Sequence, residues 1–191
     1  MAGEVRLHIM FPEDTRLIDI SQDRLRRLHD AVDLRLIKLY RYHGKRLKCR
    51  RGCSACCVDE ITVFEVEAEC IRRHHGLMLK SQEPHPEGAC AFLDGGGECR
   101  IYPSRPYVCR SQGPPLRWID ERDDGSPVEM RDICPLNEPG PPIETLPPEA
   151  CWTIGPVEVQ LTAIQISVDG GRRRRVSLRS LFSRKAGSKR F

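Results

Sequence analysis

Aromatic residues are scarce in this sequence of 191 residues, where Phe, Trp and Tyr together make up only 6%. Aromatic side chains bury much of the apolar surface of ordinary cores, and 30% of the residues here are charged. The ten cysteines, in contrast, are well above ordinary usage. We therefore expect covalent or coordinated links between thiols to help hold the fold together.

Long apolar runs are also missing. No stretch approaches the roughly 20 apolar residues that a membrane-spanning helix needs. The first 20 residues carry Glu4, Arg6, Glu13 and Asp14, and contain no apolar run of the length found in export signals. We therefore expect a cytoplasmic protein, in which thiols stay reduced and clustered cysteines bind metal more often than each other.

Familiar catalytic patterns are not evident. There is no Ser/His/Asp set and no paired-carboxylate arrangement. The run DGGGE at residues 94–98 lacks the strand and helix that flank a phosphate-binding loop, so we interpret it as a turn. Whether the chain is an enzyme is left open by these absences.

Charge is distributed unevenly along the chain. Residues 171–191 hold nine of the 31 Lys and Arg residues and none of the 27 Asp and Glu, so the remaining residues have a net charge of −5. We predict residues 169–191 to be a disordered basic tail. Contact of residues 172–190 with a polyanion, either nucleic acid or an acidic membrane surface, is an alternative role.

Hydrophobic periodicity predicts a helix over residues 21–47, preceded by an extended segment at residues 1–20. Ser21 is a suitable N-cap for this helix. The apolar positions that recur three and four residues apart are Leu25, Leu28, Val32, Leu36 and Leu39. They form one stripe, which we expect to face the core.

A second helix is predicted over residues 62–76, with a capping box formed by Thr62 and Glu65 and a stop at Gly76. Over residues 81–150, Pro, Gly and Asp interrupt every short run. Residues from about Pro156 onward fit a helix, and nearly as well a strand.

These patterns predict a mainly α fold with long irregular loops, in which residues 21–168 form a small, metal-stabilised, cysteine-rich domain. Loops of such length inside a compact domain need anchors. Five cysteines are spread along them, at Cys90, Cys99, Cys109, Cys134 and Cys151. The coincidence of loops with cysteines is the main structural argument for a coordinated metal.

Four further cysteines fall within nine residues, in the run CRRGCSACC at residues 49–57. A loop with this spacing can wrap around a centre, and Arg50 and Arg51 favour the ionised thiols that bind metal. The eight candidate ligands are Cys49, Cys53, Cys56, Cys57, Cys90, Cys99, Cys109 and Cys134. Tetrahedral zinc and a [4Fe–4S] cluster each take four ligands, so eight thiols fit two sites, or one site with spare thiols.

The adjacent pair Cys56 and Cys57 is unusual, because neighbouring side chains diverge in most backbone conformations. Either the two thiols serve two sites, or one binds metal while the other packs or reacts. Cys70 is expected to pack in the core, and Cys151 fits a ligand or a core position equally well.

The order of these motifs resembles the YkgJ-type cysteine-cluster family, a CxxCxxCC-like zinc- or iron-chelating domain. The resemblance covers about residues 49–137. The matching residues are Cys49, Cys53, Cys56, Cys57, Cys90, Phe92, Leu93, Cys99, Ile101, Tyr102, Arg105, Pro106, Cys109 and Arg110. The resemblance implies a metal-binding domain and no particular activity.

We therefore predict a metal-binding protein that holds zinc or an iron–sulfur cluster, with [4Fe–4S] favoured over [2Fe–2S] if the metal is iron. The spacing of Cys49, Cys53 and Cys56 also matches that of radical S-adenosylmethionine enzymes, but the strand–helix succession of their barrel is missing. The cysteine-cluster family also resembles part of the flagellin lysine-N-methylases. Iron–sulfur-dependent group transfer, such as protein methylation, is therefore the alternative.

Overall fold

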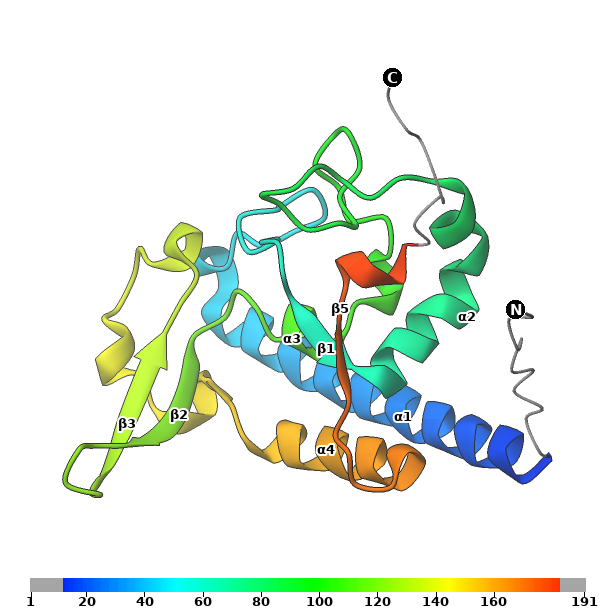
Figure 1. Ribbon diagram of the computed structural model, residues 1–191. Helices are drawn as coiled ribbons and strands as arrows, with labels where there is room; N and C mark the ends of the chain where they lie inside the picture. The colour runs from blue at the N-terminus through cyan, green and yellow to red at the C-terminus, as the bar shows by residue number, and fades with distance from the viewer. Residues whose placement is uncertain (1–11, 183–191) are drawn as a thin grey trace, which may run out of the picture.

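The computed structural model describes residues 12–182 (Figure 1). Helical residues, 3-10 turns included, make up about 49% of this part and strands 13%, so a mainly α fold is roughly confirmed. The helices are α1 (Pro12–His43), α2 (Glu65–Ser81), α3 (Tyr107–Arg110) and α4 (Pro156–Asp169). The strands are β1 (Thr62–Phe64), β2 (Leu116–Glu121), β3 (Pro127–Asp132), β4 (Trp152–Thr153) and β5 (Arg175–Ser177).

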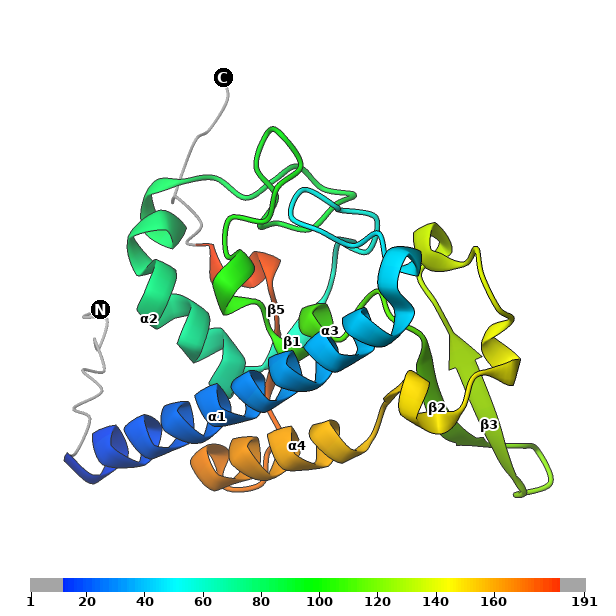
Figure 2. The ribbon, with the colours of Figure 1, turned by 180° about the vertical axis from the view of Figure 1, so that it is seen from behind.

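Helix α1 is the longest helix of residues 12–182, and both α2 and α4 pack against it, as the view from behind shows (Figure 2). The predicted apolar stripe is confirmed, since its members are all buried: Leu25, Leu28, Val32, Leu36 and Leu39. None of the helices within residues 12–182 is both long and apolar enough to span a bilayer.

The predicted start of this helix was wrong. Residues 12–20 are helical and not extended, and residues 1–11 lie outside the described part. Proline is favoured in the first turn of a helix, which explains a start at Pro12. Ser21 is not an N-cap, because its hydroxyl donates to the carbonyl of Ile18 inside the helix (2.7 Å).

The predicted second helix differs at both ends. Thr62 lies in β1, which pairs antiparallel with β5, so it forms no capping box. A partner 115 residues away in the chain therefore overrides a local signal. The helix also continues through Gly76 to Ser81, with non-helical angles only at His75. One helical glycine costs only about 1 kcal/mol, and burial of Leu79 beyond it offsets that cost.

Residues 175–182 form a strap that packs on the body of the fold, which corrects the predicted disordered tail for this segment (red in Figure 1). The strap consists of β5, Leu178, the 3-10 turn Arg179–Leu181 and Phe182. Its three apolar side chains after β5, namely Leu178, Leu181 and Phe182, are buried. Burial of these side chains, which lie on both sides of Arg179 in the sequence, holds the segment against the body. Residues 183–191 lie outside the described part.

A hairpin of β2 and β3 projects from the body, and β4 adds to β2 in parallel (Figure 1). The sequence analysis missed this hairpin, because most of its side chains are exposed and the apolar alternation, at Leu116 and Trp118 and at Val128 and Met130, spans only three residues in each strand. Helix α4 resolves the other ambiguity. It buries Leu161, Ile164 and Gln165, which are three and four apart as on one helix face.

The fold has two main apolar clusters. One lies between α1, α2 and α4 and includes Trp152, whose indole N–H donates to the Tyr107 hydroxyl (2.9 Å). The other lies between α2, the strap and the loop around Phe92. Cys57, Cys90 and Cys99 pack at this second cluster, which therefore supports the cysteine-rich loops.

Candidate metal centre

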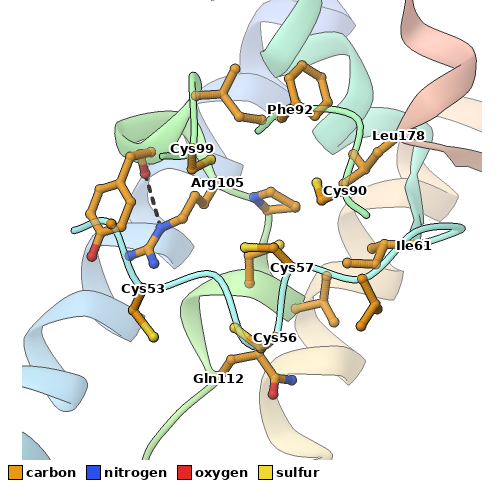
Figure 3. A pocket seen from close by; sticks show the side chains of 17 residues that line it. Cys53, Cys56, Cys57, Ile61, Cys90, Phe92, Cys99, Arg105, Gln112 and Leu178 are labelled. Atoms are coloured by element: carbon orange, nitrogen blue, oxygen red, sulfur yellow. Dashed lines mark hydrogen bonds between the residues drawn. The ribbon is translucent and has the colours of Figure 1, made fainter. Parts of the chain in front are cut away.

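Six of the ten cysteines line one pocket of about 310 Å³ (Figure 3). They are Cys53, Cys56, Cys57, Cys90, Cys99 and Cys109. All ten cysteines lie in the described part of the chain and are free thiols. The rest of the wall is mainly apolar, with Val58, Ile61, Phe92, Val108 and Leu178. The structure thus brings together thiols that lie up to 56 residues apart in the sequence.

Backbone hydrogen bonds hold these loops in place. The Cys90 amide donates to the Cys57 carbonyl (2.9 Å), which joins the first cysteine run to the second loop. Within that loop, Leu93 and Cys99 form an isolated antiparallel bridge. Cys109 lies on the short helix α3, just after Pro106. Each thiol is therefore carried by a turn or a helix whose backbone is already paired.

Cys49 lies in an adjoining pocket of about 300 Å³, which shares Cys53, Cys56 and Cys109 with the first. Leu36, Ile37 and Tyr40 of α1 form its other wall. Burial raises the pKa of the Cys49 thiol, and the nearby thiols of Cys134, Cys53 and Cys56 raise it further. Cys134 lines neither pocket, but Asn137 connects it to Cys49, because its backbone amide donates to the Cys134 carbonyl (2.7 Å) and its side-chain N–H donates to the Cys49 sulfur (3.2 Å).

Interaction between the thiols of the adjacent residues Cys56 and Cys57 lowers the pKa of Cys56 to about 6 and raises that of Cys57. Their other neighbours differ. Cys57 is also influenced by Cys90 and Cys99. Cys56, in turn, influences Cys49. Cys56 also influences Cys109 and lines both pockets, so the surroundings of the two thiols differ only in part.

Burial, together with the nearby thiols of Cys90 and Cys99, raises the pKa of Cys109 to about 12. Buried thiols this close together resist ionisation unless a cation offsets their charge. Arg105 supplies part of that charge: it lines both pockets and opposes the rise at Cys109. Its guanidinium stacks 3.7 Å from the ring centre of Tyr102, which holds it beside the thiols.

Arg110 has a structural role instead. It pairs with Asp33 of α1 and donates to the carbonyls of Pro103 and Arg105 (both 2.7 Å). Arg110 joins the Cys109 helix to α1 and so fixes one wall of the site.

Cys151 and Cys70 lie apart from the pocket. Cys151 is completely buried and accepts a long hydrogen bond from Arg131 (3.8 Å), so it occupies a core position. Cys70 lies half-buried in a different cleft, where His74 is its nearest polar neighbour (3.6 Å). Neither pocket with the clustered thiols includes His74 or His75.

The sequence did not reveal the contribution of the strap. Leu178 lines the thiol pocket, and Arg179 donates to Asp59 and to the carbonyls of His85 and Ala89. In the sequence these residues look like part of a basic tail. Arg174 and Arg175 also contact the body, at Glu65 and Thr62. Arg174, Arg175 and Arg179 therefore contact the body of the fold, which leaves less positive charge in this segment for binding a polyanion.

Two further residues around Cys49 were also missed. Gly113 has a φ of +112°, and a Cβ atom there would lie 2.6 Å from the Cys49 sulfur. Asn137 is fully buried, and its side-chain N–H donates to the same sulfur (3.2 Å). The dipeptide Gly113-Pro114 indicates only a turn. The local sequence pattern therefore connects neither Gly113 nor Asn137 to Cys49.

Within residues 12–182, no three His, Cys, Asp or Glu side chains stand in a ready metal-binding arrangement. The convergence of free thiols in one mainly apolar pocket nevertheless defines a thiol-rich site of the kind that soft metals prefer.

Residues 48–134 match the CxxCxxCC family, described as "Putative zinc- or iron-chelating domain". This match agrees with the cysteine-cluster family that the motifs of this part of the chain resemble. No curated protein and no solved structure matches the chain.

Proposed function

We propose that this chain is a metal-binding protein that holds zinc or iron through two sets of four cysteine thiolates. The observation that carries the proposal is the convergence of six free thiols on one pocket of about 310 Å³ (Figure 3). The match of residues 48–134 to a chelating domain supports it independently. Such donors are soft, and four of them complete a zinc site or a [4Fe–4S] site.

The first set is Cys57, Cys90, Cys99 and Cys109. The effect of these thiols on one another supports the grouping. The interaction with Cys56 is the largest cause of the raised pKa of Cys57, and burial is the largest for Cys109. In both cases Cys90 and Cys99 raise the pKa as well. The backbone bond between Cys57 and Cys90 supports it as well. Metal binding would draw these side chains inward across the pocket.

The second set is Cys49, Cys53, Cys56 and Cys134. Its support is that Cys134, Cys53 and Cys56 all influence Cys49. The division assigns the adjacent thiols Cys56 and Cys57 to different sets; its support is that Cys56 lines the pocket of Cys49, which Cys57 does not. It also gives four ligands to each site, with Cys70 and Cys151 in neither.

The chain's own residues would stabilise the ionised thiols. Arg105 faces both sets from its position over Tyr102, so its positive charge favours thiolates in each. The apolar wall keeps water away and strengthens these charge interactions. A bound metal would cross-link the cysteine-rich loops and, if it is iron, would also allow electron transfer.

Metal content and absorbance of the protein prepared without air test this proposal. We expect two zinc ions per chain, or iron with acid-labile sulfide and visible absorbance. The eight cysteines of the two sets should resist alkylation until the metal is removed. A colourless, metal-free protein whose eight thiols all react at once would reject the proposal.

Two variants sharpen the test. Cys99→Ser should lower the metal content, because Cys99 lines the pocket. Cys70→Ser serves as a matched control, since Cys70 is also partly buried but lies in another cleft. Equal metal loss in both variants would point to general unfolding and not to ligation.

A further inference from the structure

Asn137 is fully buried, and each hydrogen-bonding group of its side chain has a partner. Its Nδ2 donates to the Cys49 sulfur (3.2 Å) and to the Gly113 carbonyl (2.8 Å), while Oδ1 accepts from the Lys48 amide (2.6 Å). A backbone amide only donates and a carbonyl only accepts, so these partners fix the orientation of the side chain. The N–H group must therefore face the sulfur.

The residues around Cys49 pack closely against its sulfur. Gly113 approaches so closely that a Cβ atom would stand 2.6 Å from Sγ. Tyr40 of α1 lines the same pocket as Cys49. Asn137 adds a hydrogen bond to this close packing. A sulfur held in this way has few positions open to it.

Asn137 also connects Cys49 to Cys134. Its backbone amide donates to the Cys134 carbonyl (2.7 Å), which closes a 3-10 turn directly after that cysteine. One residue therefore contacts one thiol through its side chain and fixes the backbone of another. These two cysteines are 85 residues apart in the sequence.

We infer that Asn137 is a positioning residue, which holds Cys49 and Cys134 in one metal site and tunes that site through its N–H···S hydrogen bond. The inference rests on the proposed function. A hydrogen bond to a thiolate ligand withdraws electron density from the sulfur, so it shifts thiolate-to-metal charge transfer and raises the reduction potential of bound iron. Its loss also frees the ligand to move.

Spectroscopy of the cobalt-substituted protein tests this role. Cobalt(II) replaces zinc in thiolate sites, and its charge-transfer band reports on the sulfur ligands. Asn137→Leu keeps most of the side-chain volume and removes the hydrogen bond. We expect a shifted charge-transfer band and an affinity about 10- to 100-fold lower at one of the two sites, as for other residues behind metal ligands. A wild-type band with wild-type affinity would overturn the inference.

Arg46→Gln is the matched control. Arg46 donates to the carbonyls of Asn137 (2.9 Å) and Glu138 (3.1 Å), so the change loosens the same segment without touching the sulfur. We expect its cobalt band to stay in place. If Arg46→Gln shifts the band as much as Asn137→Leu does, the role of Asn137 is merely structural and the inference fails.

A second variant covers the case in which Asn137→Leu does not fold. Asn137→Asp keeps the size and the acceptor for the Lys48 amide, but places an oxygen against the sulfur. It should also weaken metal binding and shift the band, and an unchanged protein again overturns the inference. Wild-type protein that binds none of zinc, cobalt and iron would reject the proposed function itself. Normal binding with unchanged variants rejects only the role of Asn137.

Discussion

Arg179 of the C-terminal strap forms a two-point ion pair with Asp59, with Nη2 2.7 Å from one carboxylate oxygen and Nε 2.9 Å from the other. The same guanidinium donates to the carbonyls of His85 and Ala89. Asp59 follows Cys57 by two residues, and Ala89 directly precedes Cys90. Arg179 lies outside the matched residues 48–134, and its side chain joins the two loops that carry these thiols.

Replacement of Arg179 should weaken metal binding at one set of thiols. In Arg179→Gln the loops of Cys57 and Cys90 lose their shared partner, so we expect about tenfold weaker zinc retention at one of the two sites. Competition with a chelator measures this. Arg172→Gln removes the same charge from an exposed position three residues before the strap and should have no effect. Equal zinc retention in the two variants would contradict the role of the strap.

A side chain at position 113 should disturb Cys49. Gly113→Ala places a Cβ atom 2.6 Å from the sulfur, at a φ of +112° that is unfavourable for alanine. We expect a loss of about 1–3 kcal/mol in the free energy of unfolding and lower metal content, measured by urea denaturation and metal analysis.

Gly88→Ala separates the two causes. Gly88 also has a positive φ, of +96°, but a Cβ atom there meets nothing within 4 Å. It should therefore show only the backbone cost, with normal metal content. If Gly113→Ala behaves like Gly88→Ala, the contact with Cys49 has no importance for the site.

Single replacements of the adjacent thiols test the division into two sets. Cys56→Ser and Cys57→Ser should each lower the number of bound zinc ions from two to one, because each removes a ligand from a different set. The double variant should bind none. Native mass spectrometry counts the ions directly. If the double variant still retains one ion, both thiols serve the same site and the division is wrong.

The end of α4 should give a pH-dependent contribution to stability. Hydrogen bonds from Gln165, and from the backbone amides of Arg174 and Gly171, hold the pKa of Asp169 below its usual value. A carboxyl whose pKa is lower in the folded state stabilises the protein above its unfolded pKa of about 4, and this contribution is lost as pH falls through the folded value.

Asp169→Asn should accordingly destabilise the protein at neutral pH, and the difference from wild type should shrink toward about pH 3. Urea midpoints of the metal-free protein at both pH values measure it, since metal release at low pH would otherwise contribute. A difference that stays constant with pH would show that ionised Asp169 is not the cause.

Local pattern predicted those elements whose signal is contained within one segment. The stripe from Leu25 to Leu39 predicted a buried helix face, because apolar periodicity depends only on residues a few positions apart. The same approach failed at Thr62, where pairing with Ser177 replaces a cap, and at the hairpin of β2 and β3. Strand pairing depends on partners that a local window does not contain.

By itself, the sequence determined the chemistry of this protein. Eight cysteines at family-like spacing provide soft donors whatever the loops do, so the class of site follows from residue identity. Only the tertiary structure decided that six of these thiols line one pocket, that Asn137 donates to the Cys49 sulfur, and that Arg179 joins the loops of Cys57 and Cys90. These relationships join distant segments through burial and directional hydrogen bonds, which exist only once the chain has folded.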